Sequence, residues 1–114
     1  MNRGEIWLIN LDPTLGSEIK KTRPAIIVND DAIGILPLKI IVPVTEWKDR
    51  YSIAPWLVRL KPDAQNGLTK PSAADTFQVR SVAQERFVRQ LGELSTATMR
   101  EITGALALVL SIEL

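Results

Sequence analysis

The chain has 114 residues, of which 46% are hydrophobic, and its 14 basic and 13 acidic side chains give a formal net charge of +1. This length predicts a single domain, residues 1–114, and the composition excludes a disordered chain. No apolar run approaches the ~20 residues that span a bilayer. Histidine and cysteine are absent, which excludes a disulfide framework, histidine-dependent nucleophile systems and ordinary zinc sites.

Most of the chain is expected to form short strands separated by turns. Strand-forming runs lie at residues 5–10, 24–29, 39–44, 56–60 and 75–82, and residues 87–90 predict either a strand or a helical turn. Pro43 lies inside the third run and indicates an edge or a bulge there. Asp30-Asp31 and Asn66-Gly67 are turn signals between the runs.

The last part of the chain changes to a helical period. Ser95 or Thr96 can cap a helix. Five apolar residues then fall on one helical face: Met99, Ile102, Leu106, Val109 and Leu110. Residues 104–110 are apolar nearly all round, so we expect burial against the sheet or at a dimer interface. Short strands closed by one helix predict a mainly β fold, a small and strongly curved antiparallel barrel.

A long polar loop is expected between the first two strands, from about residue 11 to 22. Three cations near its end, Lys20, Lys21 and Arg23, stand directly before Pro24 and an apolar run. Pro24 disfavours the helical region for Arg23, so Arg23 is expected to be extended. Rigid scaffolds present reactive groups on such loops. A solvated basic loop is the alternative interpretation.

The charges are unevenly distributed along the chain. Residues 39–61 carry five cations against two acids, whereas the stretch from Glu93 onward carries three acids and one base. This distribution favours a polyanionic partner only weakly, because a solvated charged surface gives the same pattern.

Residues 3–28, RGEIWLINLDPTLGSEIKKTRPAIIV, resemble the opening of the MazF/PemK (Kid) family of toxin endoribonucleases. Pro43-Val44-Thr45, Gly67-Leu68 and Gln78-Val79-Arg80-Ser81 follow in the order and rough spacing of that family. The resemblance covers nearly the whole chain, and its specificity is concentrated in the first 28 residues. It implies an SH3-like (CcdB/PemK-like) antiparallel β-barrel with a C-terminal α-helix that forms a homodimer.

The resemblance also implies an activity: sequence-specific cleavage of single-stranded RNA (an mRNA interferase) with no metal or cofactor, leaving a 2',3'-cyclic phosphate and a 5'-hydroxyl. The family's catalytic arginine falls on Arg23, its threonine on Thr45 and its loop glutamate on Glu18. Because a guanidinium is essentially never deprotonated in a protein, we assign Arg23 mainly to charge stabilisation, with proton donation as a second role, and Glu18 to the general base. The alternatives are an ion pair of Glu18 with Lys20 or Lys21, and an ordinary strand-end hydroxyl for Thr45.

RNA binding requires stacking surfaces and hydrogen-bonding groups as well as charge. Trp47 and Phe77 are the candidate stacking residues, with a place in the core as the alternative for each. Trp7 and Trp56 are expected in the barrel. The predicted RNA-binding residues are Ser17, Lys20, Lys21, Thr22, Trp47, Phe77, Gln78, Arg80 and Ser81. The chain departs from the commoner family pattern at Glu46, which follows Thr45, and at Phe77, which precedes Gln78. Both departures concern base preference, and Glu46 is expected to point away from a bound phosphate.

Two other functions remain open. CcdB toxins share this barrel and dimer but poison DNA gyrase by protein contact. A non-catalytic DNA- or RNA-binding barrel would bind with salt-dependent affinity and no turnover. In either toxin interpretation an acidic antitoxin segment is expected to occupy the basic groove, with DNA a partner only through the antitoxin complex. We expect a cytoplasmic protein with no membrane partner.

Overall fold

Seven strands and one α-helix form in the part of the chain, residues 1–34 and 36–113, that a computed structural model describes. The strands are β1 (Glu5–Asn10), β2 (Thr22–Ile27), β3 (Leu38–Glu46), β4 (Leu57–Leu60), β5 (Ser72–Asp75), β6 (Arg80–Ala83) and β7 (Phe87–Glu93). Three 3-10 turns, η1 (Asp49–Ile53), η2 (Thr76–Gln78) and η3 (Gln84–Arg86), precede the helix α1 (Thr96–Val109).

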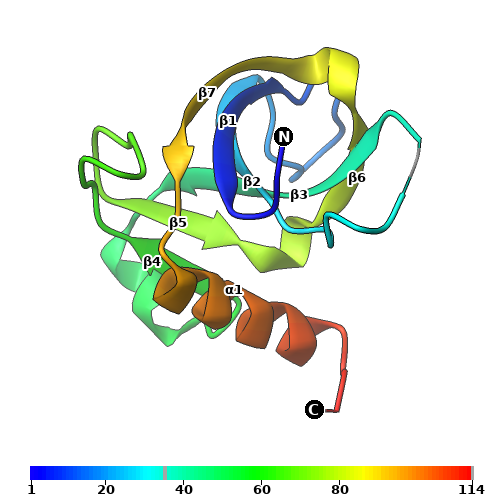
Figure 1. The fold of residues 1–114 in the computed structure, drawn as a ribbon. Coiled ribbons are helices and arrows are strands. Elements are labelled where there is room, and N and C mark those ends of the chain that lie inside the picture. Colours follow the sequence, from blue (N-terminus) through cyan, green and yellow to red (C-terminus); the bar gives the residue numbers. More distant parts are fainter. Residues whose placement is uncertain (35, 114) are drawn as a thin grey trace.

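The strands pair antiparallel in the order β4-β5-β3-β2-β1-β7, and β6 pairs with β3 beside this path. β3 is the central element, because successive parts of it pair with β6, β2 and β5. Figure 1 shows β1, β6 and β7 curving around one side of the molecule, while β4, β5 and α1 lie together on the other. The sheet curls without closing in the described residues. The predicted barrel-like, mainly β fold with a C-terminal helix is confirmed.

Two apolar clusters fill the fold. One joins the sheet to α1 and includes Ile26, Val42 and Ile102, each fully buried. The other lies on the opposite face of β2 and β3, around Ala25 and Ile41. Because successive side chains of a strand point to opposite faces, the two clusters divide the even and odd residues of these strands between them. Arg23 and Thr45 are odd-numbered residues of β2 and β3, so they belong to the face that carries Ala25 and Ile41.

The helix begins as the sequence indicates, because the Ser95 hydroxyl accepts a hydrogen bond from the backbone N–H of Thr98 (3.2 Å). Its buried residues are Met99, Ile102, Ala105 and Ala107. Leu108 and Leu110 are more than half exposed, so the prediction of an all-round buried segment is not met within a single chain. No helix in the described part of the chain has the length and apolarity needed to cross a membrane.

The predicted strand at residues 75–82 is wrong, because β5 and β6 are separated there by the turn η2. Asp75 caps this turn by accepting a hydrogen bond from the backbone N–H of Phe77 (3.1 Å). The backbone N–H and hydroxyl of Thr76, which is fully buried, donate to the carbonyl of Trp56 (3.1 and 2.7 Å). These bonds turn the chain at the point where alternation alone predicts a continuing strand.

Candidate active site

The β1–β2 loop (residues 11–21) is closed at its base by hydrogen bonds. Leu11 donates from its backbone to the carbonyl of Lys21 (2.9 Å), and a carboxylate oxygen of Asp12 accepts from the backbone N–H of Lys21 (3.1 Å). Lys21 has a φ of 71°, a left-handed conformation that turns the chain back into β2. The guanidinium of Arg80 donates to the carbonyl of Leu11 (3.3 Å). The loop therefore has a fixed base from which its tip projects.

The tip of the loop is held by Glu18 and Gln78. A carboxylate oxygen of Glu18 accepts from the backbone N–H of Leu15 (2.6 Å), which closes a turn within the loop. The side-chain oxygen of Gln78 accepts from the backbone N–H of Ile19 (2.6 Å), and its amide nitrogen donates to the carbonyl of Ser17 (3.2 Å). No ion pair joins Glu18 to Lys20 or Lys21 in the described part of the chain.

β2 and β3 diverge beneath this loop, at Pro43. Ala25 of β2 pairs with Pro43 of β3, and beyond that point β3 pairs with β5, where Thr45 lies opposite Ala73. Proline has no N–H to continue the earlier ladder, so a change of partner fits this position. This change of partner explains how Pro43 is accommodated inside a central strand. The sequence predicts an edge or a bulge at this position. By strand alternation, Arg23 and Thr45 share the face of Ala25 and Pro43.

Two neighbouring cavities lie under and beside the loop. The first, about 460 Å³, is lined by Glu18, Gln78 and Arg80 among others, and the second, about 610 Å³, by Thr45, Gln78 and Ser17 among others. Arg23 lines neither. Its half-buried side chain donates from Nε to the carbonyl of Lys20 (3.3 Å) at the edge of the loop. The structure thus brings Glu18 and Thr45 to two cavities that share Gln78, whereas Arg23 is bonded to the end of the loop.

The aromatic candidates occupy different environments. Trp47 is half-buried, with the Arg59 guanidinium 5.1 Å from its ring centroid and Tyr51 packed edge-on at 5.9 Å. Phe77 is 70% exposed and lies 6.4 Å, centroid to centroid, from the 40% exposed ring of Trp56. The expectation that Trp56 belongs to the barrel interior is therefore wrong, because its ring lies at the surface next to η2.

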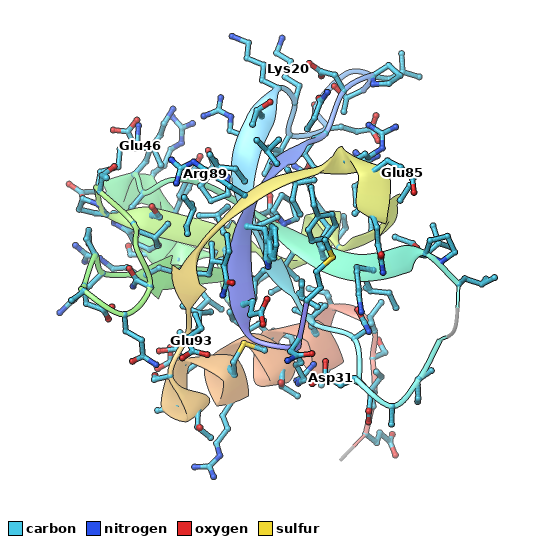
Figure 2. The ribbon with its side chains drawn as sticks, turned by 45° about the horizontal axis from the view of Figure 1, so that its top comes forward. Lys20, Asp31, Glu46, Glu85, Arg89 and Glu93 are labelled. Carbon is cyan, nitrogen blue, oxygen red and sulfur yellow. The ribbon has the colours of Figure 1, made fainter. Side chains whose placement is uncertain are left out.

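The other predicted RNA-binding residues line neither cavity: Lys20, Lys21, Thr22 and Ser81. In Figure 2 the loop tip, marked by Lys20, lies at the end of the molecule opposite Asp31 and α1. Thr22 opens β2 opposite Asn10. Ser81 is exposed on β6 and, next to Arg80 in the strand, faces the other way.

Glu46 points away from Thr45, as expected from their adjacent positions in β3. Its carboxylate lies 3.5 Å from the ammonium group of Lys70, and both side chains are more than half exposed. A surface pair of this kind contributes at most about 1 kcal/mol to stability. The pair matters for the orientation of Glu46 rather than for stability, because it holds the negative charge away from the face that carries Thr45.

Asp75 is an acid that the sequence reasoning did not assign to the site. Its carboxylate accepts from the backbone N–H of Phe77 and from the side-chain amide of Gln78 (3.2 Å), and it lines the cavity that contains Thr45. Burial raises the pKa of Asp75, with the hydrogen bonds from Phe77 and Gln78 opposing that change. Within the described residues, no three acidic side chains converge in a way that could hold a metal ion.

The Gln78→Ala variant is expected to release the tip of the β1–β2 loop. It removes the bonds to Ile19 and Ser17, and each such bond contributes about 1 kcal/mol. The amide proton of Ile19 should then exchange with solvent at least about tenfold faster, as measured by hydrogen exchange and mass spectrometry. Gln90→Ala on β7 is the matched control. Unchanged exchange at Ile19 in Gln78→Ala would show that other contacts hold the loop.

Comparison with known proteins connects this site to a family. Residues 2–110 match the family described as PemK-like, MazF-like toxin of type II toxin-antitoxin system. The curated protein Endoribonuclease MazF9 of Mycobacterium tuberculosis is 35% identical to this chain, and the alignment covers 98% of each protein.

Two solved structures from Deinococcus radiodurans are similar, each with 25% sequence identity. One is a crystal structure of MazF (TM-score 0.80, covering 98% of this chain and 97% of that one). The other is a MazE-MazF crystal structure (TM-score 0.74, 99% and 97%). These comparisons give no support to the CcdB-type alternative. With the motif in residues 3–28 and the barrel-like fold, the match over residues 2–110 places this chain in the PemK-like, MazF-like toxin family of type II toxin-antitoxin systems.

Proposed function

We propose that this chain is a sequence-specific endoribonuclease toxin that cleaves single-stranded RNA without a metal ion. The observation that carries the proposal is the match of residues 2–110 to this toxin family. The two cavities that Glu18 and Thr45 line, where β2 and β3 diverge, support it. MazF9 of M. tuberculosis, which matches over nearly its whole length, is named an endoribonuclease, and this supports the same activity here.

The reaction is an in-line displacement within the RNA. The ribose 2'-oxygen forms a bond to its neighbouring phosphorus, the bond from phosphorus to the 5'-oxygen of the next nucleotide breaks, and the products are a 2',3'-cyclic phosphate and a 5'-hydroxyl. One proton leaves the 2'-hydroxyl, and one is delivered to the departing 5'-oxygen. Because the substrate supplies the nucleophile, the protein needs neither an imidazole nor a nucleophile of its own.

Each of the three residues has a role that its chemistry suits. The Arg23 guanidinium presents a fork of N–H donors to the non-bridging phosphate oxygens, and the Thr45 hydroxyl adds one more donor. Such fixed donors stabilise the charge that develops on the phosphate in the transition state. Glu18 accepts the proton of the 2'-hydroxyl, directly or through one water molecule. The loop turn that bonds Glu18 to Leu15 and Gln78 to Ile19 supports this role, because it holds the carboxylate beside the cavity.

The same proposal includes the chain's partners and location. A homodimer, a single domain over residues 1–114 and a cytoplasmic location follow from the family resemblance. A protein antitoxin is the expected inhibitor, since the related D. radiodurans toxin has been crystallised as MazE-MazF. DNA is expected as a partner only through the antitoxin complex.

Purified protein incubated with short single-stranded RNA and excess EDTA tests the proposal. We expect discrete cuts whose 5' fragments carry a 2',3'-cyclic phosphate by mass spectrometry, while DNA of the same sequence stays intact because it lacks the 2'-hydroxyl. Intact RNA together with inhibited gyrase supercoiling would support the CcdB-type function. Intact RNA that is bound with salt-dependent affinity would support the non-catalytic barrel.

A further inference from the structure

A small hollow beside Thr45 is lined by two aromatic rings, an acid and an amide. Its volume is about 420 Å³, and its lining residues are Trp56, Asp75, Phe77 and Gln78. Single exposed apolar residues are ordinary on a protein surface. Two exposed aromatic rings in edge-to-face contact, with a carboxylate at the same hollow, form instead the mixture of apolar walls and a few polar groups that binding sites share.

The walls of this hollow are set by the turn η2 before any ligand arrives. Thr76, fully buried, ties the turn to Trp56 through two hydrogen bonds to one carbonyl. Asp75 caps the same turn and holds the Gln78 amide. Both rings and the carboxylate are therefore attached to one hydrogen-bonded unit. Because these side chains are already held in place, a ligand that binds there costs little side-chain entropy, which favours affinity.

The hollow adjoins the cavity that Thr45 lines. Three of its four lining residues, Trp56, Asp75 and Gln78, also line that larger cavity. An RNA whose phosphate reaches Thr45 would therefore place a neighbouring base next to these rings. Trp47, the other aromatic candidate, is less suited to this use because Arg59 already lies over its ring.

We propose that Trp56, Phe77 and Asp75 form a nucleobase subsite that selects guanine next to the cleaved phosphate. The base stacks on the exposed aromatic surface, as single-stranded bases do on Phe and Trp in other RNA-binding proteins. The Asp75 carboxylate accepts hydrogen bonds from the edge of the base. This subsite deepens the proposed function and rests on it, because it names the substrate feature that the nuclease reads.

Guanine is the base whose Watson–Crick edge matches the hydrogen-bonding pattern of the Asp75 carboxylate. An ionised carboxylate only accepts hydrogen bonds. Guanine presents two adjacent donors on its Watson–Crick edge, N1–H and the 2-amino group, which match two carboxylate oxygens. Uracil instead presents one N–H between two carbonyl oxygens, and those oxygens repel the carboxylate. Adenine and cytosine each offer one amino group beside an unprotonated ring nitrogen, an intermediate case.

The Asp75→Asn variant tests the hydrogen-bonding part of the subsite. Asparagine is as good a cap as aspartate, so η2 should be retained, which circular dichroism can check. Wild type and variant are each given a randomised single-stranded RNA pool, and the cut ends are sequenced. We expect a guanine preference at one position beside the cut in the wild type, reduced about five- to a hundredfold relative to uracil in the variant. Glu85→Gln, an exposed acid in η3, should leave the preference unchanged.

The stacking part is tested separately by Phe77→Ala. Loss of one stacked base should raise KM for a cleavable oligonucleotide about fivefold or more while kcat changes less. Phe77→Tyr should restore KM, because it keeps the ring. Val88→Ala, which shortens an exposed residue on β7, is the control. An unchanged KM in Phe77→Ala would overturn the stacking role.

The outcomes separate the subsite from the nuclease activity. If the wild type cleaves RNA and Asp75→Asn keeps the same base preference, the subsite is wrong and the proposed function stands. If the wild type cleaves no RNA, the nuclease proposal fails. The subsite is then tested by binding, measured as the fluorescence anisotropy of labelled guanine-rich and uracil-rich oligoribonucleotides. Tighter binding of the guanine-rich strand that Asp75→Asn abolishes would support it. Equal binding of both strands would overturn it.

Discussion

Arg23→Ala is expected to lower the rate of RNA cleavage by at least about a hundredfold. The substitution removes the guanidinium that the proposal places against the non-bridging phosphate oxygens, and loss of a single donor of this kind costs roughly 3–4 kcal/mol of transition-state stabilisation. The fold should persist, since Arg23 is only half-buried and its side-chain hydrogen bond to the Lys20 carbonyl is long at 3.3 Å. Single-turnover cleavage of a defined oligonucleotide measures the rate.

Two further variants make this result specific. Arg100→Ala removes an exposed arginine from α1, at the far end of the molecule from the loop, and should cleave at the wild-type rate. Arg23→Lys keeps the charge but loses the planar fork, so it should recover only part of the lost rate. Full activity in Arg23→Ala, with its fold verified by circular dichroism, would remove Arg23 from the mechanism and leave Thr45 and Glu18 to account for the chemistry.

The position of Arg23 also explains why a rearrangement is expected on substrate binding. Its guanidinium donates to the loop backbone at Lys20 and does not line the cavity of Thr45. Strand alternation nevertheless puts both side chains on one face of β2 and β3. A long arginine side chain can reach a phosphate over that face by changing its rotamer. The bond to Lys20 is weak enough for a phosphate, which forms stronger charge-assisted bonds, to displace it.

Local signals in the sequence were sufficient to predict several strands, loops and turns of the fold. β1 has the predicted bounds, residues 5–10, because its apolar run is short and ends at turn-forming residues. The loop that follows and the Ser95 cap were also predicted, since each depends on side chains close in sequence to the backbone they contact. Gly67 adopts a positive φ at the predicted Asn66-Gly67 turn for the same reason.

Contacts between distant residues account for what the sequence did not reveal. The turn η2 depends on the Thr76 hydroxyl bonding to a carbonyl 20 residues earlier, which no alternation pattern records. Gln78 was predicted as an RNA-binding residue, yet in this structure its amide bonds the loop at Ile19, 59 positions away in the chain. Asp75 gained importance only when the fold placed it between Trp56 and Gln78. The nearest sequence signal was its position three residues before Gln78.

Gly67→Ala is expected to lower the free energy of unfolding by about 3 kcal/mol or more. Gly67 has a φ of 69°, a left-handed conformation that costs other residues roughly 1–2 kcal/mol. A Cβ atom there would also lie 2.1 Å from the backbone carbonyl oxygen of Leu91 in β7, and backbone cannot move aside as a side-chain tip can. Moving this turn away from β7 would break the hydrogen bond from Glu93 N–H to the Gln65 carbonyl (3.0 Å), a further loss of about 1 kcal/mol.

Gly104→Ala provides the matched control for the same chemical change. Gly104 is exposed within α1, and a Cβ atom there would meet nothing within 4 Å. Glycine inside a helix is less stable than alanine by roughly 0.5–1 kcal/mol, so this variant should be more stable than the wild type. Urea denaturation followed by circular dichroism gives both free energies of unfolding. Since the two variants differ only in where one methyl group is added, opposite signs would locate the effect in the packing of the Gly67 turn on β7. A loss of no more than about 1–2 kcal/mol in Gly67→Ala would mean that left-handed strain alone, without the backbone contact, accounts for this glycine.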